Sequence, residues 1–229
     1  MKAILCKEYG PAEKLVIEEV PSPEVKGRGV KVRVKAAGLN FPDTLIIENK
    51  YQLKPSLPFS PGGEMAGEVI EVGDKVTRFK VGDRVAGLTG YGAFAEEVIV
   101  PEQNLLPVPD GMSDEKAAAF TMVYGTSYYA LKQRGNLQPG ESLLVLGASG
   151  GVGLATVELG KAMGAKVIAA ASSAEKLAVA KEAGADELIN YAEEPLKDAV
   201  KKLTHSKGVD VIYDPVGGDF TEQALRAMG

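Results

Sequence analysis

One glycine-rich segment combines residue types and spacing that could bind a phosphate-bearing ligand. Against the pattern G-x-G-x-x-G, Ala148 stands at the first glycine position, and Gly150 and Gly153 occupy the second and third. The second glycine lets a backbone approach a pyrophosphate, the third lets the following helix pack closely, and the helix N-terminus offers free N–H groups. The segment from Leu146 to Gly153 could therefore hold a pyrophosphate.

The context of this segment separates it from an ordinary glycine-rich turn between a strand and a helix. An apolar stretch at 142–146 predicts a strand before it, and the residues from 151 to 164 predict a helix after it. A second apolar strand follows at 166–172, at the spacing of a βαβ unit. The segment therefore predicts a dinucleotide-binding site.

The residues about 20 positions after Gly150 indicate which dinucleotide is bound, because NAD sites place an Asp or Glu there to accept hydrogen bonds from the ribose. This chain has small and hydroxyl residues at those positions, including Ser172, and Lys176 follows them. A lysine suits the additional phosphate of NADP, since a charge-assisted hydrogen bond is worth roughly 1.5–3 kcal/mol. Glu175 weakens this argument, and Lys176 could instead be a solvated residue of a first helical turn. We expect NADPH rather than NADH.

Metal and nucleophile chemistry are disfavoured by composition, since the chain contains one Cys and one His. Structural zinc sites need about four Cys or His ligands and catalytic sites about three protein ligands. Cys6 lies in an apolar first strand, where we expect it to be buried, and His205 lies in a polar segment, where we expect it to be solvated. We therefore expect no metal.

The charge is mildly acidic, with 26 Lys and Arg against 31 Asp and Glu, and it is spread evenly along the chain. Without a basic patch or tail, a nucleic-acid partner is not expected. No apolar stretch approaches the roughly 20 residues of a membrane span, and no secretory signal is recognisable. With its single cysteine, the chain is expected to be cytoplasmic.

The first half of the chain reads as short strands separated by turns. Apolar and β-branched runs occur at 2–10, 14–20, 30–38, 67–73, 83–88 and 93–100, and Pro, Gly and Asp lie between them. Many short strands with glycine-rich turns are typical of a small closed or nearly closed sheet. A long helix is expected from Ser113, a potential N-cap, to about residue 135.

From residue 142 onward strands and helices alternate, which is typical of a parallel sheet. We therefore expect two domains, a substrate domain over 1–122 and a dinucleotide-binding domain over 123–229. The alternation stops at Gly229 after four strands, whereas this kind of fold usually has six. We expect the chain to end inside its second domain, so that a 1–229 fragment would be poorly stable or inactive.

Separated motifs over the whole chain are similar to those of zeta-crystallin-like quinone oxidoreductases, a zinc-free group within the medium-chain dehydrogenase/reductase superfamily. The motifs are AAGLNFPDT (36–44), YQLKPSLPFSPGGEMAGEV (51–69), VGDRV (81–85), YGTSYYAL (124–131), GASGGVG (147–153), ELINY (187–191) and YDPVGG (213–218). The resemblance implies a fold of the α/β plus β class: a chaperonin-10-like (GroES-like) barrel followed by a Rossmann doubly wound parallel sheet. A final segment returning to the barrel would be absent here.

The same resemblance also implies roles for individual residues. Zinc alcohol dehydrogenases of the superfamily use a Cys and a Gly-His-Glu as ligands, where this chain has Asn40 and Gly62-Gly63-Glu64. The cleft near the nicotinamide would be lined by Asn40, Asp43 and Tyr51, with Tyr51 also touching the cofactor. The pyrophosphate would be cradled by Ser149, Gly150, Gly151, Val152 and Gly153. Further cofactor contacts are implied for Thr126, Tyr129, Ser172, Lys176, Tyr191 and Val216. The alternatives are that Tyr51 caps a loop, Tyr129 is helix core and Asn40 is a turn residue.

The expected chemistry is delivery of reducing equivalents from NADPH to a quinone, in one- or two-electron steps, with the protein positioning the two molecules. A second hypothesis is reduction of an enone, enal or enoyl thioester, for which Tyr51 is our candidate proton donor. A third is a non-catalytic, nucleotide-binding structural or RNA-associated protein, which the acidic charge disfavours. The resemblance further implies a homodimer.

Overall fold

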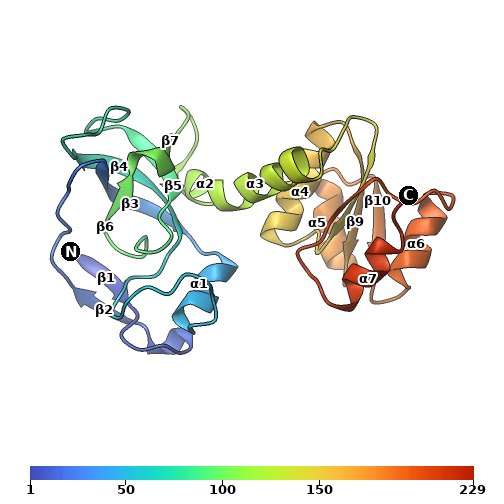
Figure 1. The fold of residues 1–229 in the computed structure, drawn as a ribbon, viewed down its shortest axis with the longest axis horizontal. Helices are drawn as coiled ribbons and strands as arrows, with labels where there is room; N and C mark the ends of the chain where they lie inside the picture. Colours follow the sequence, from blue (N-terminus) through green and yellow to red (C-terminus); the bar gives the residue numbers. More distant parts are fainter. The chain divides into compact units, whose positions relative to one another are not determined.

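The computed structural model describes residues 1–229, and the chain divides into two compact units, Met1–Met122 and Val123–Gly229. The first unit is rich in strands, and the second alternates strands with helices (Figure 1). None of the helices combines the length and the apolar character that crossing a membrane would require.

The first unit contains a five-stranded antiparallel sheet with the order β6-β3-β4-β5-β7 and a separate two-stranded ribbon of β1 and β2. The strands are β1 (Lys2–Leu5), β2 (Val16–Glu19), β3 (Gly29–Gly38), β4 (Glu64–Val72), β5 (Arg84–Leu88), β6 (Glu97–Pro101) and β7 (Leu105–Pro107). The ladder does not close into a ring, and isolated bridges at Ala3–Ala95 and Cys6–Phe59 extend the pairing. The sheet, expected to be closed or nearly closed, is therefore an open ladder that these bridges extend.

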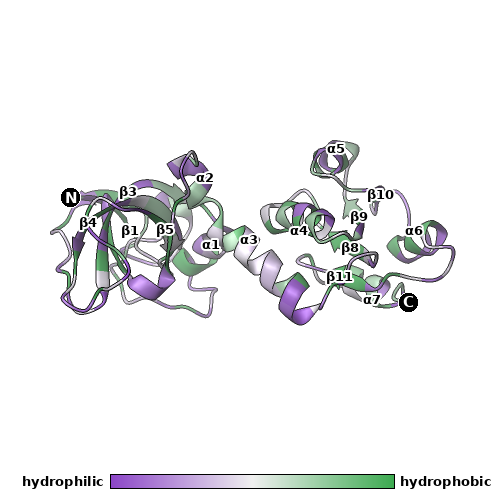
Figure 2. Ribbon diagram, turned by 90° about the horizontal axis from the view of Figure 1, so that it is seen from above, coloured by the Kyte–Doolittle hydropathy of each residue, from purple (hydrophilic) through white to green (hydrophobic).

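The core of this unit comes from side chains on one face of the strands. Alternate residues of a strand point to opposite faces, so Val30 and Val32 of β3 enter the same cluster as Met65 and Val69 of β4. The strands of this unit include green, hydrophobic stretches in Figure 2. Helix α1 (Phe41–Ile47), which the sequence analysis missed, follows β3 and has a proline in its first turn, where proline is well tolerated.

The single long helix expected from residue 113 is wrong, because the segment has three parts and is interrupted between the first and the second. These are α2 (Asp114–Ala118), α3 (Thr121–Tyr128) and a π-helical turn (Tyr129–Arg134). The expected N-cap is confirmed, since the Ser113 side chain accepts a hydrogen bond from the backbone N–H of Lys116. A side chain outside the helix causes the break: Glu64 accepts a hydrogen bond from the backbone N–H of Met122, in place of a helical carbonyl.

The second unit contains a four-stranded parallel sheet with the order β10-β9-β8-β11, and the expected alternation is confirmed. Its elements are β8 (Ser142–Leu146), α4 (Gly151–Ala162), β9 (Lys166–Ala171), α5 (Ala174–Glu182), β10 (Glu187–Asn190), α6 (Leu196–Leu203), β11 (Val211–Tyr213) and α7 (Asp219–Leu225). This order is part of the doubly wound arrangement of dinucleotide-binding sheets.

Both faces of this parallel sheet are covered by helices, which explains why its strands are continuously apolar. Successive residues of β8 alternate between two core clusters: Val145 packs with Val157 of α4, and Leu144 packs with Val200 of α6. The first cluster also contains residues of α5, and the second contains residues of α7. The sheet is thus packed between two helical layers.

We expect Gly153→Ala to destabilise the protein, because a Cβ at residue 153 would stand 2.2 Å from the carbonyl oxygen of Gly147. Helix α4 would have to move away from the end of β8, which costs about 1–3 kcal/mol for overpacking of this kind. The urea midpoint, followed by circular dichroism, measures the loss. Gly125→Ala is the control, since a Cβ there meets nothing within 4 Å and helix propensity favours Ala by about 1 kcal/mol. Equal midpoints for the two variants would contradict the tight-packing account.

Candidate functional site

The loops that follow the four parallel strands lie at the same edge of the sheet, because parallel strands point their carboxyl ends the same way. The cofactor contacts that were expected in the loops after these strands all lie at this edge. Ser149, Gly150, Gly151, Val152 and Gly153 follow β8; Ser172 and Lys176 follow β9; Tyr191 follows β10; and Val216 follows β11. The structure thus brings together residues separated by up to 67 positions in sequence (149 to 216).

The turn after β8 has the geometry that the glycine pattern predicts, with one difference. The sharp turn is made by Gly147, whose φ of 58° lies in the left-handed region that favours glycine. Its carbonyl oxygen accepts a hydrogen bond from the N–H of Gly150 at 3.0 Å. Gly150 is the N-cap of α4, so the backbone N–H groups of the first helical turn point into this loop. Ala148, at the first position of the pattern, is buried.

The loop after β9 ends in a second helix start, which holds a lysine in place. Ser173 is the N-cap of α5, and its side chain accepts a hydrogen bond from the backbone N–H of Lys176 at 3.3 Å. The ammonium of Lys176 donates to the Ser172 hydroxyl at 2.9 Å, and it has no carboxylate partner. Neighbouring Glu175 therefore does not neutralise Lys176, and a hydroxyl and an exposed ammonium stand together. The capping role of Ser173 was missed in the sequence.

The loops after β10 and β11 are each fixed by a nearby contact. The ring of Tyr191 packs on Phe220 of α7, with centroids 4.5 Å apart. The Asp214 carboxylate accepts hydrogen bonds from the backbone N–H groups of Val216 at 3.0 Å and Gly217 at 2.9 Å, and from the Thr221 hydroxyl at 2.5 Å. Sequence reasoning missed Asp214, although an Asp followed by Pro and two glycines is a turn signal. The Asp214 carboxylate fixes the backbone of Val216, whose side chain is half-exposed.

Two further expected contacts lie on the helical segment before β8. Thr126 of α3 is exposed, and Tyr129, the first residue of the π-helical turn, is 53% exposed and so is not helix core. Between them Ser127 is buried, and its hydroxyl donates to the backbone carbonyl of Val152 at 2.9 Å. This bond fixes α3 against the first turn of α4, a positioning role that no motif signalled.

A second tie between these helices is the hydrogen bond from the Tyr124 hydroxyl to the Glu158 carboxylate. The carboxylate, followed by burial, raises the pKa of Tyr124 to about 12, so the phenol stays protonated and keeps donating. Helices α3 and α4 are therefore held together by two hydrogen bonds.

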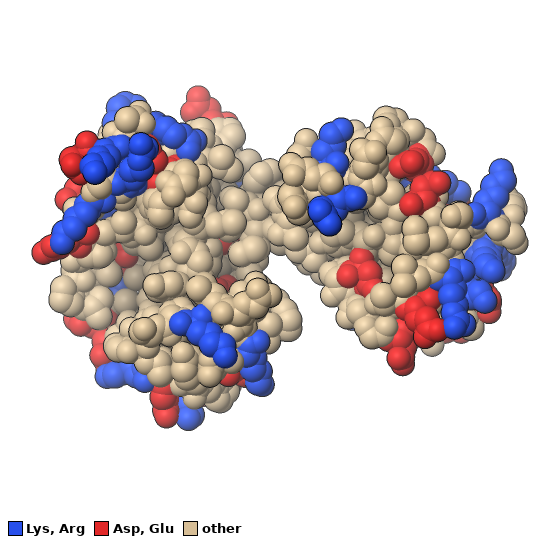
Figure 3. Space-filling model, in the orientation of Figure 1, with Lys and Arg blue, Asp and Glu red and all other residues tan.

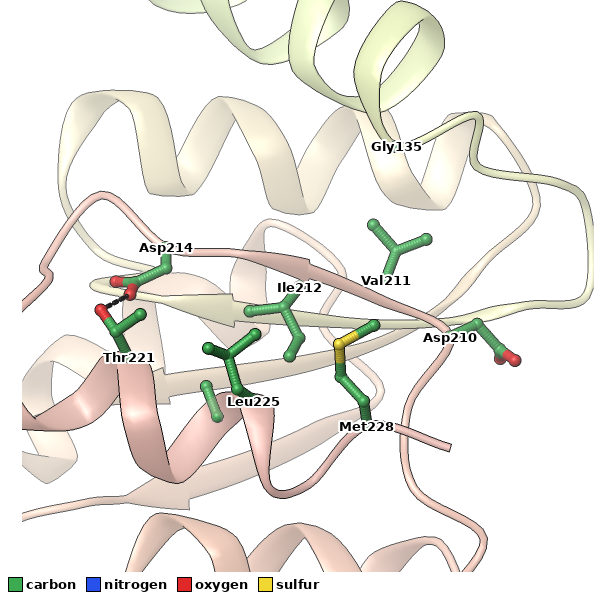
Figure 4. Close-up of a pocket in the computed structure, with 9 residues that line it drawn as sticks. Gly135, Asp210, Val211, Ile212, Asp214, Thr221, Leu225 and Met228 are labelled. Atoms are coloured by element: carbon green, nitrogen blue, oxygen red, sulfur yellow. Dashed lines mark hydrogen bonds between the residues drawn. The ribbon is translucent and has the colours of Figure 1, made fainter.

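A pocket of about 370 Å³ lies along β11 rather than across the strand ends (Figure 4). Ile212, Leu225 and Met228 give it a mainly apolar lining, and Asp214 with Thr221 closes one end. None of the site residues expected from the sequence lines it. The pocket follows the edge of β11 that has no strand partner.

The first unit holds a buried acidic cluster around Asn40, the N-cap of α1. The backbone N–H of Asn40 donates to Asp43 at 2.8 Å, and its side-chain amide donates to Glu64 at 3.0 Å. Asp43 is 3% exposed and Glu64 is 1% exposed. Asn40 is therefore held by carboxylates on both sides, which is more than a turn residue requires.

Burial raises the pKa of Asp43, against the opposing effect of backbone N–H groups at Asn40, Gly63 and Gly62. Burial also raises the pKa of Glu64, and the nearby charge of Asp43 adds to the effect. Hydrogen bonds from Met122 and Asn40 act in the opposite direction on Glu64. Burial thus raises the pKa of both carboxyl groups, and the hydrogen bonds that they accept offset part of this rise.

Tyr51 belongs to a different packing group from this acidic cluster. Its half-buried ring packs against the cluster formed by Cys6, Ile46, Ile47 and Phe59. Its hydroxyl has no hydrogen-bond partner, so Tyr51 does not cap a loop through that group.

The residues present do not suit a zinc ion. No group of three or more His, Cys, Asp or Glu side chains is arranged to hold a metal. Cys6 is buried, as expected, and its pKa is raised by that burial, whereas His205 is exposed at the end of α6. The oxygens of Asp43 and Glu64 already accept from amide N–H groups.

Charges of both signs occur on the visible face of each unit (Figure 3). Neither unit presents a face covered by one sign in this view, which agrees with the even distribution along the sequence.

Family models match both halves of the chain. Residues 26–110 match the alcohol dehydrogenase GroES-like domain, and residues 151–229 match the model described as zinc-binding dehydrogenase. The GroES-like first domain and the Rossmann-type second domain expected from the sequence are thereby confirmed.

Known proteins match the chain over its whole length. It is 46% identical to a quinone oxidoreductase-like protein 2 homolog of Nematostella vectensis, covering 99% of this chain and 62% of that protein. It is 43% identical to a quinone oxidoreductase of Pseudomonas aeruginosa, covering 99% of this chain and 70% of that protein. The chain spans between 62% and 65% of the length of the quinone oxidoreductase-like protein 2 relatives.

Solved structures agree with the sequence matches. An Escherichia coli quinone oxidoreductase complexed with NADPH matches with a TM-score of 0.94 and 36% identity, over 100% of this chain and 70% of that one. A Pseudomonas syringae quinone oxidoreductase matches with a TM-score of 0.94 and 42% identity, over the same shares. The expected motifs lie on the expected elements, and these relatives share the whole length of the chain. The chain therefore belongs to the quinone oxidoreductase family of the medium-chain dehydrogenase/reductase superfamily.

Proposed function

We propose that this chain is the larger part of an NADPH-dependent oxidoreductase that reduces quinones without zinc. The observation that carries the proposal is the glycine turn Gly147–Gly153 beside the Ser172–Lys176 pair at the carboxyl edge of the parallel sheet. The family and the NADPH complex of the Escherichia coli relative support it.

The loops fit a phosphorylated dinucleotide. A Cβ at Gly150 would come no closer than 3.5 Å to protein atoms, so the space before the α4 N-terminus is open for a ligand. There Ser149, Gly150, Gly151, Val152 and Gly153 would hold the pyrophosphate through backbone N–H groups. Ser172 and Lys176 would hold the 2′-phosphate, Tyr191 the adenosine, and Thr126, Tyr129 and Val216 the nicotinamide half.

When bound, the cofactor supplies the reducing equivalents, and the protein supplies binding and orientation. We propose that Asn40, Asp43 and Tyr51 face the cofactor and the substrate. A quinone needs no metal to polarise it, which suits a cluster whose carboxylates are engaged with amide groups.

The free hydroxyl of Tyr51 favours a second candidate, reduction of an enone, enal or enoyl thioester. Such a substrate needs a proton at its alpha carbon and gains from a donor to its oxygen. A phenol with no partner in the protein could serve either purpose.

We also propose that the complete protein is a cytoplasmic homodimer with a small-molecule substrate and no nucleic-acid partner. The family resemblance supports the dimer, and the single, buried cysteine suits a reducing compartment.

Lys176→Ala is expected to raise the Michaelis constant for NADPH by about 10- to 100-fold, because one charge-assisted contact to the 2′-phosphate is lost. The constant for NADH should hardly change, since NADH lacks that phosphate. Steady-state kinetics with both cofactors measure the difference. Lys201→Ala, which removes an exposed lysine of α6, is the matched control. An equal effect of Lys176→Ala on NADPH and NADH would refute the assignment.

The substrate class is tested by following NADPH absorbance with a quinone and with a matched panel of enones and enoyl thioesters. We expect rapid oxidation of NADPH with the quinone and slow oxidation with the other compounds. A preference for the conjugated carbonyls would move the assignment to the second candidate. Tight NADPH binding without oxidation by any acceptor would refute a catalytic role.

A further inference from the structure

Glu64 is a buried acidic residue of the first unit, and its contacts could not be inferred from the sequence alone. It begins β4, it is 1% exposed, and both of its carboxylate oxygens are engaged. One oxygen accepts from the backbone N–H of Met122 at 2.7 Å, and the backbone N–H of Thr121 also contributes. The other accepts from the side-chain amide of Asn40 at 3.0 Å.

The space for this carboxylate is built into the neighbouring strand. A Cβ at Gly38 would stand 2.7 Å from the carboxylate of Glu64 and 3.4 Å from the amide nitrogen of Asn40. It would also stand 2.6 Å from the carbonyl oxygen of Ala118. Any side chain at residue 38 would thus require the Glu64 carboxylate or the backbone at Ala118 to move.

The hydrogen bond between Asn40 and Glu64 also determines the orientation of the Asn40 side-chain amide. An ionised carboxylate only accepts hydrogen bonds, so the end of the amide that faces it is the donor, Nδ2. The backbone of Asn40 is fixed independently by its hydrogen bond to Asp43. Glu64 therefore sets the polarity of the amide, and the backbone N–H of Asp43, with which the Asn40 side chain forms a capping box, supports the same orientation.

We propose that Glu64 is a positioning residue for the reaction, which acts by holding the Asn40 amide in a single orientation. This inference rests on the proposed function, in which Asn40 faces the cofactor and the substrate. Glu64 is too deeply buried to touch either, so its influence passes through Asn40.

The decisive variant is Glu64→Gln, which keeps the shape and changes one acceptor into a donor. The backbone N–H groups of Met122 and Thr121 cannot turn round, so the new amide oxygen must face them. The new amide nitrogen then faces Asn40, whose own amide must rotate to present its oxygen. We expect kcat to fall about tenfold or more, since misplaced groups near the chemistry have costs of this size.

A double-mutant cycle separates this role from a purely structural one. If Glu64 acts through Asn40, Glu64→Gln should cause no further loss of kcat in an Asn40→Ala background. If the losses of kcat in the two single variants multiply in the double variant, the proposal is overturned. A kcat for Glu64→Gln within twofold of that of the original protein would also overturn it. The experiment uses the complete protein with NADPH and 1,4-naphthoquinone.

Glu102→Gln is the matched control. Glu102 is a further buried carboxylate of the same unit, 2% exposed, which accepts from the backbone N–H groups of Thr77 and Arg78 and from the Arg28 guanidinium. This variant should lower the unfolding midpoint and leave kcat within about twofold, since about tenfold losses are expected only where a group near the chemistry is misplaced. A similar fall in kcat for both variants would show a general effect of disturbing the fold and would overturn the proposal.

A spectroscopic readout keeps the proposal testable if the protein does not oxidise NADPH, an outcome that would refute the proposed function alone. In protein labelled with ¹⁵N at asparagine side chains, the Asn40 resonances are assigned from their loss in Asn40→Ala. They should shift in Glu64→Gln and stay in place in Glu102→Gln. Unmoved Asn40 resonances in Glu64→Gln would contradict the inference.

If Glu64→Gln does not fold, Asn40→Asp provides the test. A protonated Asp at residue 40 can still donate to Glu64, whereas an ionised one adds a third carboxylate to the cluster. Activity should therefore persist at low pH and fall as the pH rises past the pKa of the new group, with Asp43 and Glu64 as the nearby acids. A pH profile identical to that of the original protein would refute the proposed orientation.

Discussion

The candidate cofactor site depends on how closely α4 approaches the end of β8. No side chain fits between Gly153 and the carbonyl of Gly147, so the first turn of α4 lies directly behind the sharp turn that follows the strand. Ser127 and Tyr124 then fix α3 to α4. The free N–H groups at the start of α4 are therefore held where the loops after the other parallel strands also end.

In the first unit, two neighbouring carboxylates are buried around Asn40. Asp43 and Glu64 are stable there because backbone and side-chain amides donate to them, which offsets part of the cost of removing charge from water. The same contacts interrupt the helical segment before Thr121 and hold Asn40. One set of hydrogen bonds thus shapes the helix start and orients a candidate site residue.

Periodicity and glycine spacing were enough to predict the alternating elements of the second unit and the turn at Gly147–Gly153, because local patterns decide both. Long-range contacts were not visible in the same way. The break between α2 and α3 comes from Glu64, which is 58 residues from its partner Met122. Helix α1, with its proline in the first turn, and Asp214 carried local signals that were missed, whereas Ser127 carried none. The glycine pattern placed the phosphate site at 147–153 and pointed to Lys176, whereas the contacts to the nicotinamide half came only from the family resemblance.

The central claim is that the loops after the four parallel strands form one NADPH site, and amide hydrogen exchange with and without NADPH tests it most directly. The account predicts slower exchange in 147–153, 172–176 and 214–217 when NADPH is added, with NADH protecting 172–176 less. Protection confined to the pocket along β11, or unchanged exchange in these loops at saturating NADPH, would contradict the account.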